Sequence, residues 1–301
     1  MPPRPSQPGR PADNRRPVID RARRSSMRYP GPDMQDEPLA RVRPDDTAAA
    51  LAHLARDGAV AFESVLDHAT VTALAAGLDV AVSQSADALR RKGMATSDAG
   101  IAHHILTAHP AFAEFLAALP AAGTVDRFLG GSFILNSFGG LLNRPSGPGE
   151  YLHRWHRDLR AFAASDDIRL MINMLVALDP FTADNGATLL DLGSHRAVRR
   201  DDRPERVVRF EAPAGSVLLF DSRLFHAAGS NRSAAERRAL TLTFTPPYFK
   251  PQIDHVKQFG VARTAAAGEL LKRRLGWYAR IPESLDDWYN PPEQRFYRED
   301  R

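Results

Sequence analysis

The stretch GSVLLFDSRLFHAAGSNRSAAERRALTLTF, residues 215–244, contains two apolar runs on either side of a polar segment. The first run, VLLF, and the last, ALTLTF, have the length and the β-branched and aromatic content of strands. His226 lies between them. The stretch therefore predicts two strands with a histidine in the connecting segment.

Short runs of the same kind continue toward the N-terminus and are separated by Gly, Pro, Asn and Asp. They are SFILNSFGGLL (132–142), EYLHRWHRD (150–158), IRLMINMLVAL (168–178), GATLLDL (186–192) and ERVVRFEA (205–212). Seven or more strands at this spacing are typical of a β-barrel or a β-sandwich.

The regions on either side of these runs have helical patterns. Three predicted helices precede the strands and one follows them, over residues 45–58, 66–93, 109–120 and 262–276. Asp67 is a suitable N-cap for the second helix and Gly93 a suitable end. We expect helices first, then an antiparallel barrel, with the helices packed on its outside.

The composition limits the possible chemistry. The 301 residues, 43% of them hydrophobic, suffice for the core of one large domain. There is no cysteine, which excludes disulfide scaffolds, thiol catalysis and cysteine-ligated metals. Because no apolar run approaches the roughly 20 residues of a membrane helix, we expect no membrane partner and a cytoplasmic location.

The basic charge is concentrated at the N-terminus. Residues 1–30 contain eight arginines and two aspartates, a net charge of +6, and the whole chain carries +4, so the remainder sums to about −2. We interpret residues 1–44, rich in Pro and Arg, as a disordered leader, and residues 45–301 as a single domain. With no basic patch expected on the folded part, no specific nucleic-acid partner is predicted.

A metal site is suggested by His156 and Asp158. Residues i and i+2 of a strand share a face, so this pair presents one imidazole and one carboxylate to a common point. A third ligand would complete a 2-His-1-carboxylate triad, which holds Fe(II) and leaves positions open. Of the later histidines, His195, His226 and His255, the one between two strands, His226, is the strongest candidate. The alternative is a surface ion pair between Asp158 and a nearby arginine.

A candidate cation for a dicarboxylate co-substrate lies in the final strand. Arg237 shares one face with Ala239, Thr241 and Thr243, which is small and polar and suits a cavity wall. The other face, with Arg238, is mostly apolar. We therefore predict that Arg237 points inward and binds a carboxylate, with Thr241 as a possible helper, and that Arg238 reaches solvent at the strand edge.

Four motifs in order resemble the phytanoyl-CoA dioxygenase family of Fe(II)/2-oxoglutarate oxygenases. They are WHRD (155–158), NGATLLDLGSHR (185–196), DSRLFHAAGSN (221–231) and RRAL (237–240). The segment DGAVAFESVLD (57–67) is similar to the N-terminal part of the family, and the resemblance covers roughly residues 47–250. One departure is Arg157, where the family often has Gln.

The resemblance implies a mainly β fold, a cupin-like double-stranded β-helix (jelly roll) over about residues 131–249 with helices outside. It implies His156, Asp158 and His226 as iron ligands and Arg237 as the 2-oxoglutarate residue. The cofactors would be Fe(II), 2-oxoglutarate and O2. The implied reaction hydroxylates an unactivated C–H bond of a small molecule, with bacterial secondary metabolism as a candidate setting, and releases succinate and CO2. Desaturation, epimerisation or cyclisation with the same cofactors, and a non-catalytic small-molecule-binding jelly roll, are alternatives.

Several other polar residues are candidates for the site. Asn173, in an otherwise apolar run, would bond either the co-substrate or a neighbouring strand. Thr188 would line the cavity beside the co-substrate. The candidates for substrate contact are His103, His104, Arg157 and Asn136. For the two histidines, the alternative is an exposed polar position in a loop between helices.

Overall fold

The computed structural model describes residues 38–94, 100–145, 155–159, 168–196, 204–289 and 291. All of them belong to one compact unit, Asp33–Arg301. Within this part of the chain, no helix has both the length and the apolar character that crossing a membrane requires.

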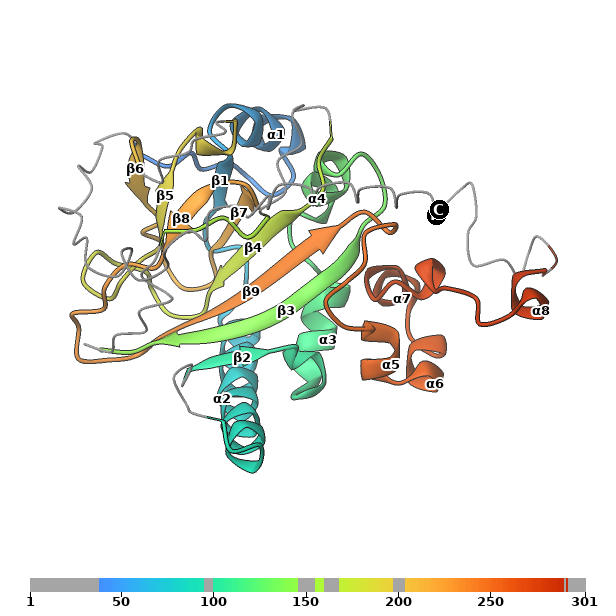
Figure 1. The fold of residues 1–301 in the computed structure, drawn as a ribbon. Coiled ribbons are helices and arrows are strands. Elements are labelled where there is room, and N and C mark those ends of the chain that lie inside the picture. Colours follow the sequence, from blue (N-terminus) through green and yellow to red (C-terminus); the bar gives the residue numbers. More distant parts are fainter. Residues whose placement is uncertain are drawn as a thin grey trace, which may run out of the picture. The chain divides into compact units, whose positions relative to one another are not determined.

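Two antiparallel sheets form the centre of the unit (Figure 1). The six-stranded sheet has the order β1-β7-β4-β9-β3-β2, and the three-stranded sheet the order β6-β5-β8. The strands are β1 (Ala59–Phe62), β2 (Ile101–His103), β3 (Ile134–Asn143), β4 (Ile172–Ala177), β5 (Leu189–Asp191), β6 (Val207–Arg209), β7 (Val217–Asp221), β8 (Phe225–Ala227) and β9 (Arg237–Thr245). The fold is the predicted mainly β, jelly-roll class with flanking helices.

The two faces of the large sheet bury different sets of side chains. On β9, Leu240 and Leu242 pack in the cluster that includes the helices, whereas Ala239 packs in the cluster shared with the small sheet. Strand β4 alternates in the same way, with Met174 toward the helices and Leu175 toward the small sheet. The period-2 alternation of the strands therefore separates an outer, helix-covered face from an inner face.

The helices before residue 130 cover the outer face and the end of the large sheet (Figure 1). They are α1 (Thr47–Arg56), α2 (His68–Arg91), α3 (Pro110–Ala117) and α4 (Ala122–Phe128). The Asp67 carboxylate caps α2 by accepting from Thr70 N at 2.7 Å, as predicted. Gly140 lets α2 approach β3, because a Cβ there would lie 2.4 Å from a methyl group of Leu78.

The C-terminal part differs from the single helix predicted over residues 262–276. It contains α5 (His255–Phe259), α6 (Val261–Ala265), α7 (Glu269–Arg274) and α8 (Leu285–Trp288). The predicted helix is interrupted at Gly268, whose φ of −63° and ψ of 154° are those of extended backbone. Three short 3₁₀ helices complete the element order, η2 (Ile105–Thr107), η3 (Ser194–Arg196) and η4 (Trp277–Ala279).

Two further differences concern segments that were expected to be irregular. Residues 38–44, assigned to the leader, partly pack on the domain: Leu39 is buried, and Arg41 forms a parallel bridge with Ala61 of β1. The rest of the leader, residues 1–37, lies outside the described residues. Strand β2, in the expected loop between helices, pairs with β3 and forms an edge of the large sheet.

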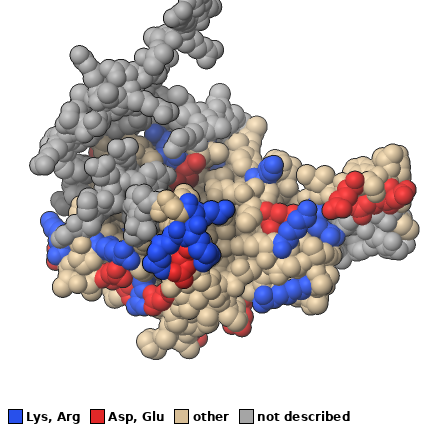
Figure 2. All heavy atoms as spheres, turned by 60° about the horizontal axis from the view of Figure 1, so that its bottom comes forward, with Lys and Arg blue, Asp and Glu red and all other residues tan. Residues whose placement is uncertain are grey.

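Basic and acidic side chains are intermixed on the described surface of the face drawn in Figure 2. The described surface also carries exposed ion pairs between oppositely charged side chains, such as Arg232–Asp184 and Arg273–Glu269.

Candidate metal centre

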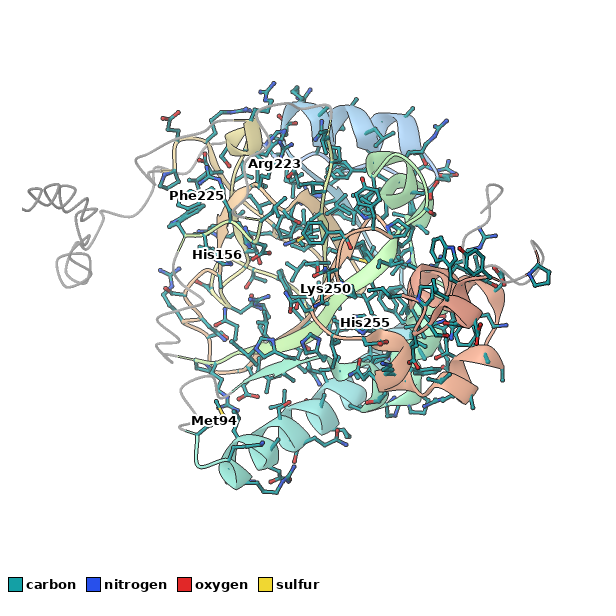
Figure 3. All side chains as sticks on the ribbon, turned by 45° about the vertical axis from the view of Figure 1, so that its right-hand side comes forward. Met94, His156, Arg223, Phe225, Lys250 and His255 are labelled. Atoms are coloured by element: carbon teal, nitrogen blue, oxygen red, sulfur yellow. The ribbon has the colours of Figure 1, made fainter. Side chains whose placement is uncertain are left out.

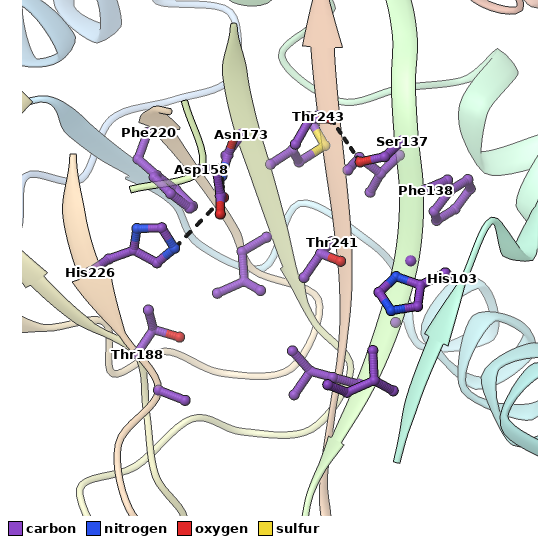
Figure 4. Close-up of a pocket in the computed structure, with 18 of the residues that line it drawn as sticks. His103, Ser137, Phe138, Asp158, Asn173, Thr188, Phe220, His226, Thr241 and Thr243 are labelled. Carbon is purple, nitrogen blue, oxygen red and sulfur yellow. Dashed lines mark hydrogen bonds and ion pairs between the residues drawn. The ribbon is translucent and has the colours of Figure 1, made fainter. Parts of the chain in front are cut away.

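The side chains of His156, Asp158 and His226 meet at one point in the cavity between the sheets. Figure 4 shows two of them, Asp158 and His226. Each offers a ligand atom, and these atoms all lie within 4.8 Å of one another. The Asp158 carboxylate is central: its Oδ1 lies 3.4 Å from His156 Nε2, and its Oδ2 lies 3.7 Å from His226 Nε2. Among the residues that the structure describes, this is the one group of three such side chains with metal-binding spacing.

Strand pairing brings the two histidines together. His156 and His226 form an antiparallel bridge, with backbone N···O distances of 2.9 Å and 3.0 Å. On its other edge, β8 pairs with β5. The strand predicted over residues 150–158 is described only from Trp155, so His153 lies outside the described residues.

The ring of His226 is oriented by a backbone carbonyl. Its Nδ1 lies 3.0 Å from Leu224 O, and because a carbonyl only accepts, this nitrogen is the donor. Nε2 is then left with a lone pair that faces Asp158. Burial lowers the pKa of His226, and the attraction of Asp158 only partly opposes this effect. The ring is therefore neutral at neutral pH, which is the form that binds metals.

Asp158 is ionised. Burial by itself raises its pKa, but His226, His156 and a hydrogen bond from Asn173 together outweigh burial and hold the pKa at about 2. The side chain retains 33% of its accessible surface, and this surface faces the cavity. Two imidazoles and one carboxylate are a donor set that suits Fe(II).

Arg237 is fully buried in the wall of the same cavity. Its Nε donates to Asn185 O at 3.2 Å, and its guanidinium lies 3.8 Å from the ring centre of Phe181. Its Nη1 is buried and has no hydrogen-bond partner in the structure. Burial lowers the pKa to about 10 against the opposing attraction of Asp179, so the group is a cation at neutral pH. A buried cation with an unpaired arm is suited to a carboxylate.

The cavity has a volume of about 380 Å³ and brings together most of the predicted site residues. Its wall includes the three metal-ligand candidates, Arg237, Thr188, Thr241, Asn173, His103, His104 and Arg157. As the alternation predicted, Arg237 and Thr241 face inward, and Arg238 bonds Asp179 at the edge instead.

His103 is the last residue of β2 and lies on the side of the cavity away from His226 (Figure 4), and His104 follows it in the chain. His104 has a positive φ of 54°, and its backbone carbonyl accepts a hydrogen bond from Gln258. Arg157 lies on the opposite side, where its guanidinium is 4.8 Å from the ring centre of Phe225 and 3.4 Å from Ser194 O.

One predicted contact differs in the structure. Asn136 does not line the cavity: it lies at the irregularity of β3 between Leu135 and Ser137, is buried, and its amide donates to Lys250 O at 3.2 Å. For Asn173, the bond to Ser222 at the end of the adjacent strand β7 fits the predicted alternative of a neighbouring strand, and the contact with the co-substrate stays a prediction. The amide of Asn173 donates to Asp158 and its carbonyl accepts from the hydroxyl of Ser222.

Ser222 was not predicted from the sequence. It follows β7 in the segment Asp221–Leu224, which precedes His226. The polar run at residues 221–223, shortly before the candidate ligand His226, is only a weak signal for a role at the site. The tertiary structure is what shows that Ser222 reaches Asn173 on the adjacent strand.

Comparisons with known proteins identify a family and a shared fold. A family model described as phytanoyl-CoA dioxygenase (PhyH) matches residues 54–239. The uncharacterized protein Rv1501 of Mycobacterium tuberculosis is 32% identical over 253 residues, which cover 80% of this chain and 90% of that protein. Dioxygenase trt7 of Aspergillus terreus is 29% identical over 266 residues, covering 81% and 88%.

Solved structures share the fold. The non-heme alpha-ketoglutarate-dependent carbocyclase SnoK from nogalamycin biosynthesis superposes with a TM-score of 0.53 at 19% identity, covering 77% of this chain and 98% of that chain. The epimerase SnoN, in complex with Fe3+, alpha-ketoglutarate and nogalamycin RO, has a TM-score of 0.52 at 20% identity, covering 69% and 87%.

Proposed function

The chain belongs to the phytanoyl-CoA dioxygenase family and is a 2-oxoglutarate-dependent dioxygenase, and we propose that His156, Asp158 and His226 hold its Fe(II). The observation that supports this most strongly is the convergence of three ligand atoms within 4.8 Å, in a cavity that also contains the buried, unpaired arm of Arg237.

Arg237 is the residue that we assign to 2-oxoglutarate. Its buried Nη1 would donate to the distal carboxylate, and Thr188 and Thr241 line the cavity with hydroxyl groups that would accept or donate further bonds. The surrounding protein excludes water and strengthens the ion pair. With Fe(II), 2-oxoglutarate and O2 bound, the site supplies the oxidation of a substrate C–H bond, with release of succinate and CO2.

The primary substrate is a small molecule that occupies the part of the cavity away from Arg237. Between His226 and His103, the floor of this part presents Thr241 of β9 and the hydroxyl pair Ser137–Thr243, whose oxygens are 2.8 Å apart (Figure 4). His103, His104 and Arg157 border the same space. These groups would bind polar atoms of the substrate and orient the C–H bond to be oxidised.

Hydroxylation is the reaction outcome that we propose. Desaturation, epimerisation and cyclisation start from the same site and cofactors, and likeness of fold does not select among them. Mass spectrometry of the product separates them: hydroxylation adds an oxygen atom, desaturation or ring closure removes hydrogen, and epimerisation leaves the mass unchanged. Substrate-stimulated succinate release over a panel of compounds identifies the substrate. Binding of a compound without succinate release would support the non-catalytic alternative.

Anaerobic titration with Fe(II) and then 2-oxoglutarate tests the site directly. A visible metal-to-ligand charge-transfer band should appear in the wild type and be absent in His226→Ala. His68→Ala, which changes an exposed histidine at the start of α2, is the matched control and should retain the band. An unchanged band in His226→Ala would refute the ligand assignment.

A further inference from the structure

The carboxylate of Asp158 is held by Asn173 of the large sheet, and Asn173 is held in turn by Ser222, which follows β7. Asn173 of β4 donates its amide to Asp158 Oδ2 (Figure 4), and Ser222 donates its hydroxyl to the carbonyl of Asn173. The bond from Ser222 fixes the orientation of the Asn173 amide. Because the hydroxyl donates to the carbonyl oxygen, the NH2 group of Asn173 is turned toward Asp158.

Ser222 is itself held rigidly, in the turn between β7 and β8. The preceding Asp221 is buried and accepts from Arg223 Nε at 3.1 Å and Nη2 at 2.8 Å, and from Arg169 Nη1 at 3.2 Å. Figure 3 shows Arg223 and Phe225 toward the same part of the molecule as His156. The turn is therefore a fixed point beside the metal-ligand candidates.

The same turn contacts the metal site in two other ways. Ser222 O accepts from the backbone N of Leu159, the residue after Asp158, at 2.9 Å. Leu224 O is the acceptor for Nδ1 of His226 at 3.0 Å. The turn thus positions the backbone next to Asp158, the side chain of Asp158 through Asn173, and the ring of His226.

The χ2 torsion of an aspartate is broad, so its carboxylate takes a defined orientation only where neighbouring groups impose one. Here each oxygen lies near one of the candidate ligand nitrogens, Oδ1 at 3.4 Å from His156 Nε2 and Oδ2 at 3.7 Å from His226 Nε2, but only Oδ2 also accepts from the amide of Asn173. The amide therefore occupies part of Oδ2 and fixes the orientation of the carboxylate.

We propose that Asn173 and Ser222 are positioning residues that keep Oδ1 of Asp158 as the metal-facing oxygen and prevent the carboxylate from binding through both oxygens. This inference rests on the proposed metal site. Its consequence is functional, since a carboxylate that uses one coordination position leaves the others for 2-oxoglutarate and O2. In this role Asn173 acts through Asp158.

The test uses Co(II), whose visible spectrum reports coordination, in the absence of 2-oxoglutarate. Asn173→Leu, which removes the donor at similar size, should weaken Co(II) binding by roughly 10- to 100-fold and alter the d–d absorption. Ser222→Ala should shift both readouts in the same direction by a smaller amount. Thr264→Val removes a buried hydroxyl bond in α6 and should leave both readouts at wild-type values.

The outcomes separate this inference from the metal site on which it rests. Circular dichroism first shows which variants are folded, and Ser222→Ala is a milder second probe should Asn173→Leu not fold. Wild-type Co(II) affinity and spectrum in a folded Asn173→Leu or Ser222→Ala protein would overturn the positioning role. Lack of Co(II) binding by the wild type, or unchanged binding in His226→Ala, would instead overturn the metal site.

Discussion

His156 and His226 are directly opposed across an antiparallel bridge, with two reciprocal backbone hydrogen bonds and ring centroids 4.3 Å apart. Opposed residues of an antiparallel pair project their side chains to the same face. The separation of these two candidate ligands is therefore set by strand pairing, and the i+2 relation places Asp158 beside them. A site built on backbone pairing in this way is preorganised before any metal arrives.

The first prediction concerns the adjacent arginines of β9. Arg237→Met should weaken 2-oxoglutarate binding by about 2 to 5 kcal/mol, roughly 30- to several-thousand-fold, because a buried charged hydrogen bond is lost. Arg238→Met is the matched control, since Arg238 bonds Asp179 at the edge. Titration of the charge-transfer band gives both affinities. Equal weakening in the two variants would contradict the assignment of Arg237.

The second prediction concerns the turn that carries Ser222. Arg223→Met leaves the buried Asp221 without its bidentate partner and should lower the free energy of unfolding by about 3 to 5 kcal/mol. Arg232→Met breaks an ion pair whose side chains are 71% and 78% exposed. That pair should contribute no more than about 1 kcal/mol. Urea denaturation of both variants measures the difference, and similar losses would show that the turn is not held by this ion pair.

The third prediction concerns pH. Burial lowers the pKa of His255, and contacts with Asn136 O, Gln258 and Asp254 only partly oppose it; burial likewise lowers the pKa of His195. The unfolded chain binds protons below about pH 6.5 that the folded protein does not bind, so stability should be full above this pH and fall below it.

Urea unfolding of the metal-free protein between pH 8 and pH 5 tests this dependence. His255→Gln should reduce its slope by up to about 1.4 kcal/mol per pH unit, the value for one proton. His68→Gln, at an exposed position, should leave the slope unchanged. An unaltered slope in His255→Gln would show that this ring does not contribute.

The fourth prediction compares two glycines with positive φ. At Gly93, with φ of +64°, an added Cβ meets nothing within 4 Å, so Gly93→Ala should cost only the conformational penalty of about 1 to 2 kcal/mol. At Gly186, with φ of +79°, a Cβ would lie 2.3 Å from Gly229 O and 2.4 Å from Asn143 Nδ2.

Gly186→Ala should therefore destabilise the protein more than Gly93→Ala, because the backbone has to move. It should also weaken 2-oxoglutarate binding, since Asn185 O is the acceptor for Arg237 Nε. Thermal unfolding and the charge-transfer titration measure the two effects. Equal stability losses in the two variants would show that the contacts around Gly186 relax freely.

Much of the local structure could be predicted because it depends on neighbours in the chain. The N-cap of α2 at Asp67 and the inward face of β9 follow from side-chain chemistry and from the period of 2. On β9 the two faces differ in polarity, so the inner one could be chosen. On β3 the pairing register shifts between Leu135 and Ser137, and alternation alone could not show that Ser137 would line the cavity while Asn136 would not.

The sequence by itself determined which residues share a strand face, where the long helices begin, and that His156 and Asp158 belong together. These properties are local, because they arise from backbone geometry and from side chains a few positions apart. Only the tertiary structure decided that β2 pairs with β3, that His226 lies opposite His156, and that Asn173 connects Asp158 to Ser222. Those contacts join segments far apart in the chain, and their register is selected by the packing of two sheets, which no short stretch of sequence encodes.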